Sequence, residues 1–190
     1  MKKLIYIAAA IIVIAGIFTI SHINAKEKTM TANKTLVAYF SATGNTRGVA
    51  ERLASATGAD LFQIEPTEVY TDDDLNWRND KSRSSVEMGN LESRPGIANT
   101  VADMSQYEII FLGFPIWWGR EPSIVDTFVT SYDFAGKKII PFATSGSTPT
   151  TADADVRIQT LAPNASVITG KRFPTNVSQD ELNAWAGEWL

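Results

Sequence analysis

The sequence predicts a doubly wound α/β domain in which helices cover both faces of a five-stranded parallel sheet. From Thr35 onward, short β-rich runs alternate with segments whose apolar residues recur at helical spacing, which is the pattern of βα units. Residues 108–118 (EIIFLGFPIWW) are apolar almost throughout, as expected of a parallel strand buried on both faces. In this class of fold, ligands bind beyond the carboxyl ends of the strands, so the loops after the strands are the candidate site.

Five runs are assigned as strands, at residues 35–40, 61–64, 108–118, 138–143 and 166–173. The fourth contains Pro141, which lacks a backbone donor, so an irregular strand is expected there. Helices are expected around the apolar positions of residues 49–54, 124–128, 156–161 and 182–189. Gly58 stops the first helix, and Pro122 stands in the first turn of the second. Ser178 and Glu181 form a capping box before the last helix.

Residues 65–105 are polar and contain several proline, glycine and aspartate residues, which predicts an irregular segment with short helical pieces. Trp77 in this segment is expected to wedge over the core rather than to reach the site. Residues 72–74 are three aspartates without a second acidic cluster at ligand spacing, so no metal site is predicted.

The chain divides into three parts: residues 1–25 as a signal peptide or membrane anchor, 26–34 as a linker, and 35–190 as the domain. Two lysines precede a 17-residue run without charge from Leu4 to Ile20, in the order typical of an export signal. The run also just reaches the shortest membrane-spanning length, so cleaved signal and uncleaved anchor both stay open. We expect the protein to be exported or anchored on the extracytoplasmic side, with membrane contact only through this segment.

Composition excludes several classes of protein. The chain is 44% hydrophobic and 20% charged, which excludes disordered and collagen-like chains. It has no cysteine, and its one histidine, His22, lies in the targeting segment, so the domain lacks thiol nucleophiles, histidine triads and histidine-bound metals. Residues 1–25 hold two of the 17 basic residues and none of the 21 acidic ones, so the rest carries a net charge of −6. Nucleic acid is therefore not an expected partner, and a protein partner is expected to be basic.

The loop after the first strand combines hydroxyls with the start of a helix. Ser41 to Thr46 (SATGNT) places side-chain hydroxyls, backbone N–H groups and the positive helix end around one point, which suits a phosphate. It is not a P-loop, because it has no lysine, and the chain has no G-x-G-x-x-G at this position. The alternative is an ordinary polar turn in which Asn45 or Thr46 caps the helix.

The run VAYFSATGNTRGVAERL, residues 37–53, resembles the FMN phosphate loop of flavodoxins. The matching residues are Tyr39, Ser41, Gly44, Thr46, Ala50 and Leu53, whereas Ala38 stands where a larger apolar residue is usual. The resemblance extends over most of residues 35–190, because GFPIWWG and PFATSGS after the third and fourth strands are similar to a flavodoxin-like subgroup. It implies a flavodoxin-like fold that binds FMN noncovalently.

The resemblance implies that the loops after the third and fourth strands flank the flavin ring. Continued alternation would send Trp117 and Trp118 to opposite sides, one into the core and the other toward solvent or flavin. The predicted cofactor-binding residues are Ser41, Ala42, Thr43, Gly44, Asn45, Thr46, Pro115, Ile116, Trp117, Trp118, Gly119, Thr144, Ser145 and Gly146.

The resemblance also implies that Gly119 occupies the place of a peptide that turns over on flavin reduction in flavodoxins. Arg120 follows it where acidic residues are common in the family, so we expect a cation at the flavin edge. The alternative is that Gly119 merely ends a strand and that Arg120 points to solvent.

The function implied is that of an electron-transfer protein that cycles FMN between oxidised, semiquinone and hydroquinone forms and exchanges electrons with redox partner proteins. No catalytic side chain is predicted, because the flavin carries the chemistry. One alternative is an NAD(P)H-dependent FMN reductase of the same fold with a quinone or metal acceptor. A second is a noncatalytic module that binds another phosphorylated ligand.

Overall fold

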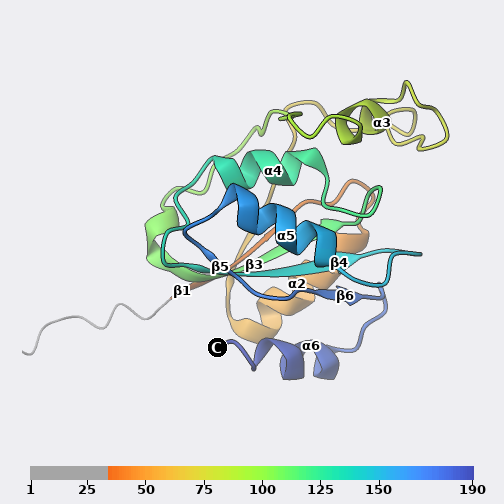
Figure 1. The fold of residues 1–190 in the computed structure, drawn as a ribbon. Helices are drawn as coiled ribbons and strands as arrows, with labels where there is room; N and C mark the ends of the chain where they lie inside the picture. The colour runs from red at the N-terminus through yellow and green to blue at the C-terminus, as the bar shows by residue number, and fades with distance from the viewer. Residues whose placement is uncertain (1–33) are drawn as a thin grey trace, which may run out of the picture. The chain divides into compact units, whose positions relative to one another are not determined.

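The computed structural model describes residues 34–190, and in this range the strands form one parallel sheet (Figure 1). The strand order is β2-β1-β3-β4-β5, and β6 also pairs with β4. This order confirms the predicted doubly wound, flavodoxin-like class. The strands are β1 (Lys34–Tyr39), β2 (Asp60–Gln63), β3 (Tyr107–Pro115), β4 (Lys138–Thr144), β5 (Ser166–Val167) and β6 (Lys171–Phe173).

The helices cover both faces of the sheet, with α2 (Asn45–Thr57) and α6 (Gln179–Ala186) on one face and α4 (Ser123–Thr130) and α5 (Ala152–Leu161) on the other (Figure 1). The connection from β2 to β3 carries α3 (Arg83–Met88) and the short 3₁₀ helix η1 (Met104–Gln106). We call residues 65–103 of this connection the β2–β3 insertion. In Figure 1, α3 lies beyond α4, on its outer side from the sheet.

Side-chain alternation along the central strands builds a separate hydrophobic core on each face. Val37 and Tyr39 of β1 belong to the core beneath α2 and α6, whereas Leu36 and Ala38 belong to the core beneath α4 and α5. All four side chains are almost fully buried, so β1 is a central strand that both cores require.

Local signals in the sequence set the helix ends. The helix α2 stops at Gly58, whose left-handed φ of 64° suits a residue without a Cβ atom. At the start of α6, the Ser178 hydroxyl accepts a hydrogen bond from the Glu181 backbone N–H at 3.1 Å, as a capping box requires. The helix α4 begins one residue after Pro122, which is its N-cap rather than its first residue.

Pro141 is expected to disturb its own strand, but the irregularity lies in the neighbouring predicted strand, residues 166–173. The strand β4 is regular and pairs with β3 throughout, with Pro141 opposite Leu112. On its other side, Lys138 and Ile139 pair with β5, whereas residues 142–144 pair with β6. The predicted strand 166–173 is therefore broken opposite Pro141, because a proline offers no N–H to a neighbouring strand there.

The strands β3 and β4 approach closely at Gly113, which pairs with Phe142. A Cβ atom at Gly113 would lie 2.2 Å from the Phe142 ring, so the ring occupies the volume that a side chain would need. Phe142 is completely buried in the core beneath α2 and α6. Only glycine fits at position 113 while the phenylalanine keeps this place.

The predicted targeting segment, residues 1–25, and the linker up to residue 33 lie outside the described residues, whereas Lys34 is the first residue of β1. Among the helices of residues 34–190, none is long and apolar enough to cross a membrane. The same residues contain no cluster of three histidine, cysteine or acidic side chains that could hold a metal ion.

Candidate functional site

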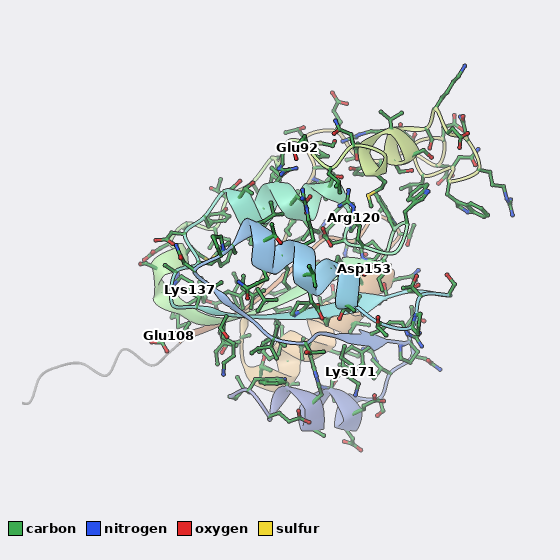
Figure 2. The ribbon with its side chains drawn as sticks, viewed as in Figure 1. Glu92, Glu108, Arg120, Lys137, Asp153 and Lys171 are labelled. Carbon is green, nitrogen blue, oxygen red and sulfur yellow. The ribbon has the colours of Figure 1, made fainter. Side chains whose placement is uncertain are left out.

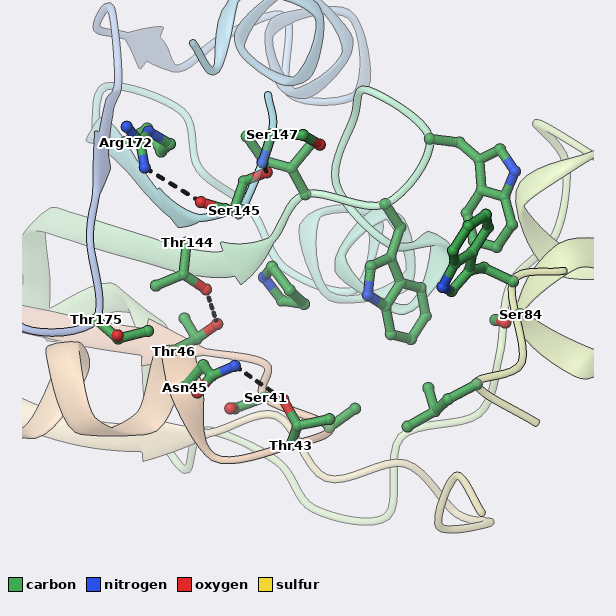
Figure 3. Close-up of a pocket in the computed structure, with 18 of the residues that line it drawn as sticks. Ser41, Thr43, Asn45, Thr46, Ser84, Thr144, Ser145, Ser147, Arg172 and Thr175 are labelled. Carbon is green, nitrogen blue, oxygen red and sulfur yellow. Dashed lines mark hydrogen bonds between the residues drawn. The ribbon is translucent and has the colours of Figure 1, made fainter. Parts of the chain in front are cut away.

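A cavity of about 910 Å³ opens at the carboxyl edge of the sheet (Figure 3). Its walls come from the loops after β1, β3 and β4, from the residues around the end of β6, and from the β2–β3 insertion. Twelve predicted site residues line it: Ser41, Ala42, Thr43, Asn45, Thr46, Pro115, Ile116, Trp117, Trp118, Thr144, Ser145 and Gly146. The other two, Gly44 and Gly119, belong to the turns that form its walls but do not line it.

The loop after β1 presents the start of α2 to the cavity. Gly44 precedes the helix with a left-handed φ of 87°, and no side chain caps the helix. The interpretation that Asn45 or Thr46 caps α2 is therefore wrong: the Asn45 amide donates to the Thr43 hydroxyl at 3.3 Å, and the Thr46 and Thr144 hydroxyls bond to each other at 3.0 Å. The first N–H groups of α2 consequently stay available for an anion.

The buried pair of threonine hydroxyls joins two walls of the cavity. Thr46 is 1% exposed and Thr144 is 4% exposed, so their hydrogen bond is shielded from water. It connects the first turn of α2 to the carboxyl end of β4, although 98 residues separate the two positions in the chain. This bond holds the loop after β1 in register with the loop after β4.

The loop after β3 is a tight turn from Trp117 to Arg120. The Trp117 N–H donates to the Arg120 carbonyl at 2.9 Å, and the Arg120 N–H donates to the Trp117 carbonyl at 3.1 Å. Its central residues, Trp118 and Gly119, have φ values of 48° and 90°, which are typical of a type I′ turn. Among residues 34–190, Trp118 is the one residue other than glycine with a positive φ.

The two tryptophans of this turn have different environments, as the alternation along the strand predicts. Trp117 packs edge-on against Phe40 and Tyr70, with ring centroids 5.6 and 5.5 Å apart. Trp118 is 52% exposed and lines the cavity mouth. Trp117 therefore anchors the turn to the core, and Trp118 is free to stack on a planar ligand.

Both expectations for the Arg120 side chain are wrong, because it points neither to the cavity nor to solvent. The side chain is only 12% exposed, and Figure 2 places it on the α4 side of the sheet. Its guanidinium donates to Glu121 Oε1 at 3.3 Å and to the Ser123 hydroxyl at 3.2 Å. Arg120 therefore fastens the turn to α4.

Arg120 belongs to a buried charge cluster behind the cavity wall. The completely buried Asp126 accepts hydrogen bonds from Arg157, the shorter at 3.0 Å, and Arg94 of the β2–β3 insertion lies 3.7 Å from the same carboxylate oxygen. Arg157 also donates to the Leu91 carbonyl at 2.6 Å. The cluster thus ties the insertion to α4 and α5.

Glu121 is the second buried carboxyl of this cluster. Burial raises its pKa to about 9, and a hydrogen bond with Asp126 together with the charge of Asp126 adds to the rise. Glu121 Oε2 and Asp126 Oδ1 are both buried without a hydrogen-bond partner among the described residues, and a proton held between the two carboxyls would satisfy both atoms. The raised pKa favours the protonated form of the Glu121 side chain.

Sequence reasoning missed part of the cavity lining. The prediction that Trp77 wedges over the core is wrong, because this residue is 64% exposed and lines the cavity. A tryptophan within an otherwise polar segment was the sequence signal that could have identified it. The other lining residues outside the predicted set are Leu75, Ser84, Ser147, Arg172, Pro174 and Thr175.

The fold and the cavity together define a doubly wound α/β protein with a candidate ligand site at the carboxyl ends of β1, β3 and β4. The model of the flavodoxin family matches residues 34–189, and the chain belongs to that family. A search of curated proteins finds no match.

Solved structures of flavoproteins resemble the chain. A putative flavoprotein from Bacteroides uniformis is 42% identical over 82% of this chain and 98% of its own, with a TM-score of 0.77. One from Bacteroides eggerthii is 38% identical over 82% of this chain and 96% of its own, also with a TM-score of 0.77. A Lactobacillus acidophilus flavoprotein in complex with FMN shares the fold, with 22% identity over 82% of this chain and 99% of its own, and a TM-score of 0.62.

Proposed function

We propose that this protein binds FMN noncovalently and transfers electrons between redox partners while the flavin cycles through its three redox states. The observation that carries the proposal is that the cavity has a hydroxyl-rich part and an aromatic part. A hydroxyl-rich loop with uncapped helix N–H groups forms one part, and the indole rings of Trp117 and Trp118 form another. This arrangement suits a ligand that combines a phosphate with a planar aromatic ring. The FMN complex of the Lactobacillus acidophilus flavoprotein supports the choice of ligand.

The residues present fit such a cofactor. The volume of about 910 Å³ lies within the range of about 300–1,000 Å³ that is usual for small-molecule sites. Ser41, Thr43 and the first N–H groups of α2 would hold the phosphate. Trp118 and the loop after β4 would hold the ring, with indole stacking on one side and backbone polar groups at its edge.

In this proposal, bound FMN supplies the electron-transfer chemistry, and the protein binds and orients it. The type I′ turn fixes Trp118 at the cavity mouth, and the Thr46–Thr144 bond sets the spacing of the two polar walls. The packing of Trp117 against Phe40 and Tyr70 closes the cavity toward the core, which excludes water from that side.

Titration of the purified, flavin-free protein with FMN tests the proposal. We expect quenching of flavin fluorescence, a flavin absorption spectrum in the complex, and reversible reduction by dithionite. Oxidation of NADH or NADPH by the FMN complex in the presence of a quinone or ferric acceptor would favour the FMN reductase alternative instead. If the protein binds no flavin, the remaining alternative is a noncatalytic module that binds another phosphorylated ligand.

We further propose that the partners are basic redox proteins, because residues 26–190 carry a net charge of −6. The N-terminal sequence supports an exported or anchored location. Fractionation of cells that express the full chain, followed by protease treatment of intact cells, tests the location. A basic electron donor or acceptor should reduce or oxidise the bound flavin more slowly as the salt concentration rises.

A further inference from the structure

The cavity has one ionisable side chain among the described residues that line it. Serine, threonine, asparagine, alanine, glycine, proline, leucine, isoleucine and tryptophan make up the rest of the lining, whereas Arg172 contributes a guanidinium. The lining therefore contains a positive charge and no carboxylate. A cavity with this balance favours an anionic ligand over a neutral one of the same shape.

The Arg172 guanidinium is fixed but not neutralised by the protein. Its Nη1 atom donates to the Ser145 carbonyl at 3.1 Å, and no carboxylate of residues 34–190 lies within 4.0 Å of it. The neighbouring Lys171 is different, because it pairs with Glu181 of α6 at 3.1 Å and does not line the cavity. The two side chains alternate across β6, and Figure 2 shows Lys171 on the α6 side.

Contacts connect Arg172 with the polar part of the cavity. Arg172 bonds to Ser145, and the preceding Thr144 bonds to Thr46 in the first turn of α2. Thr175, three residues beyond Arg172, also lines the cavity. In Figure 3, Arg172 and Thr175 lie at the same end as Thr46, whereas Ser84 of α3 lies at the other end.

We propose that Arg172 is the counter-cation for the ligand phosphate and makes the cavity selective for FMN over riboflavin. The inference rests on the proposed function, because it takes FMN as the occupant. The loop of residues 41–46 supplies neutral donors, and the helix end supplies only about half a unit charge. A phosphate monoester carries about −1.5 to −2 at pH 7, so neutral donors leave most of that charge uncompensated. Arg172, which lines the same cavity from β6, would supply a full charge and further N–H donors.

The test compares Arg172→Gln with Lys171→Gln in the full-length, flavin-free protein. Each variant is titrated with FMN and with riboflavin, and flavin fluorescence gives the dissociation constants. Loss of a charge-assisted hydrogen bond should weaken FMN binding about tenfold or more in Arg172→Gln. Riboflavin affinity should stay within about twofold, because riboflavin lacks the phosphate, and Lys171→Gln should bind both ligands as the wild type does. Arg172→Lys should recover part of the FMN affinity.

Salt provides a second measurement that needs no substitution. For the wild type, FMN affinity should fall as sodium chloride rises from about 0.05 to 0.5 M, whereas riboflavin affinity should change little. Equal losses for FMN and riboflavin in Arg172→Gln, or an unchanged FMN affinity, would overturn the role of Arg172 while leaving FMN binding intact. A wild-type protein that binds neither flavin would instead overturn the proposed function, and the inference with it.

Discussion

The buried hydroxyls of Thr46 and Thr144 form a hydrogen bond with each other. Replacing either residue alone with valine leaves one buried hydroxyl without this partner, which costs about 1–3 kcal/mol. We therefore expect Thr46→Val and Thr144→Val each to lower the free energy of unfolding, as measured by urea denaturation. The double variant should lose less than the sum of the two, because it buries no unmatched hydroxyl. Strict additivity would show that the two hydroxyls are not coupled.

A substitution at Gly119 in the Trp117–Arg120 turn tests the backbone conformation of a single residue. Gly119 has a φ of 90°, yet a Cβ atom there would meet nothing closer than the Asp153 carboxylate at 3.8 Å. Gly119→Ala should therefore lower the free energy of unfolding by about 1 kcal/mol through backbone strain alone. Gly119→Asn is the matched control, because asparagine tolerates the left-handed region better than alanine. Alanine as stable as glycine would contradict the type I′ turn.

At the level of secondary-structure elements, the Glu121–Asp126 pair joins the turn after β3 to α4 and introduces a dependence on pH. Folding raises the Glu121 pKa from 4.5 to about 9. Between these values the folded protein holds a proton that the unfolded chain releases, so the free energy of unfolding should fall as pH rises from about 5 to 9. Glu121→Gln keeps a neutral donor beside Asp126 and should remove this part of the slope.

Urea denaturation at several pH values measures the slope for the wild type, for Glu121→Gln and for a control variant, Glu108→Gln. Glu108→Gln is the control, because Glu108 is exposed on β3 and lies outside the buried cluster. It should keep the wild-type pH dependence. The same slope in Glu121→Gln and in the wild type would show that no proton is shared between the two buried carboxyls.

The regular elements were predictable from the sequence because their signals are local. The continuous apolar run of β3, Gly58 at the end of α2 and Ser178 at the start of α6 each act within a few residues. Pro141 shows where this reasoning ends. A proline in a strand predicts a defect, but which neighbour takes up the defect depends on the pairing on both sides of β4, which is a tertiary property.

The polar loops of the candidate site were predictable for the same reason, because each follows directly after a strand. Arg172 was not, because it joins the cavity wall and bonds to Ser145 only after distant parts of the chain have come together. The inward direction of Arg120 likewise depends on carboxyls and arginines from several elements. Side-chain periodicity says which face a residue occupies, whereas such partners are set by the assembled fold.

At the scale of the whole molecule, both hydrophobic cores are built from buried residues between Leu36 and Ala186. We therefore expect residues 26–190, expressed without the apolar segment, to fold into a soluble domain that binds FMN. Circular dichroism, a cooperative urea transition and FMN titration measure this. A shorter fragment that begins at residue 41 lacks β1, which pairs on both sides and contributes to both cores, and should not fold. A disordered 26–190 fragment would contradict the prediction.

The close contact between Gly113 and the Phe142 ring couples two positions that are adjacent in the sheet, so we expect their side-chain sizes to evolve together. Because the ring lies where a Cβ atom at position 113 would be, neither position can change in size independently. Natural relatives with alanine or a larger residue at 113 should carry a smaller residue at 142, so the pair should covary. Laboratory selection from Gly113→Ala for restored stability should likewise yield compensating substitutions at position 142.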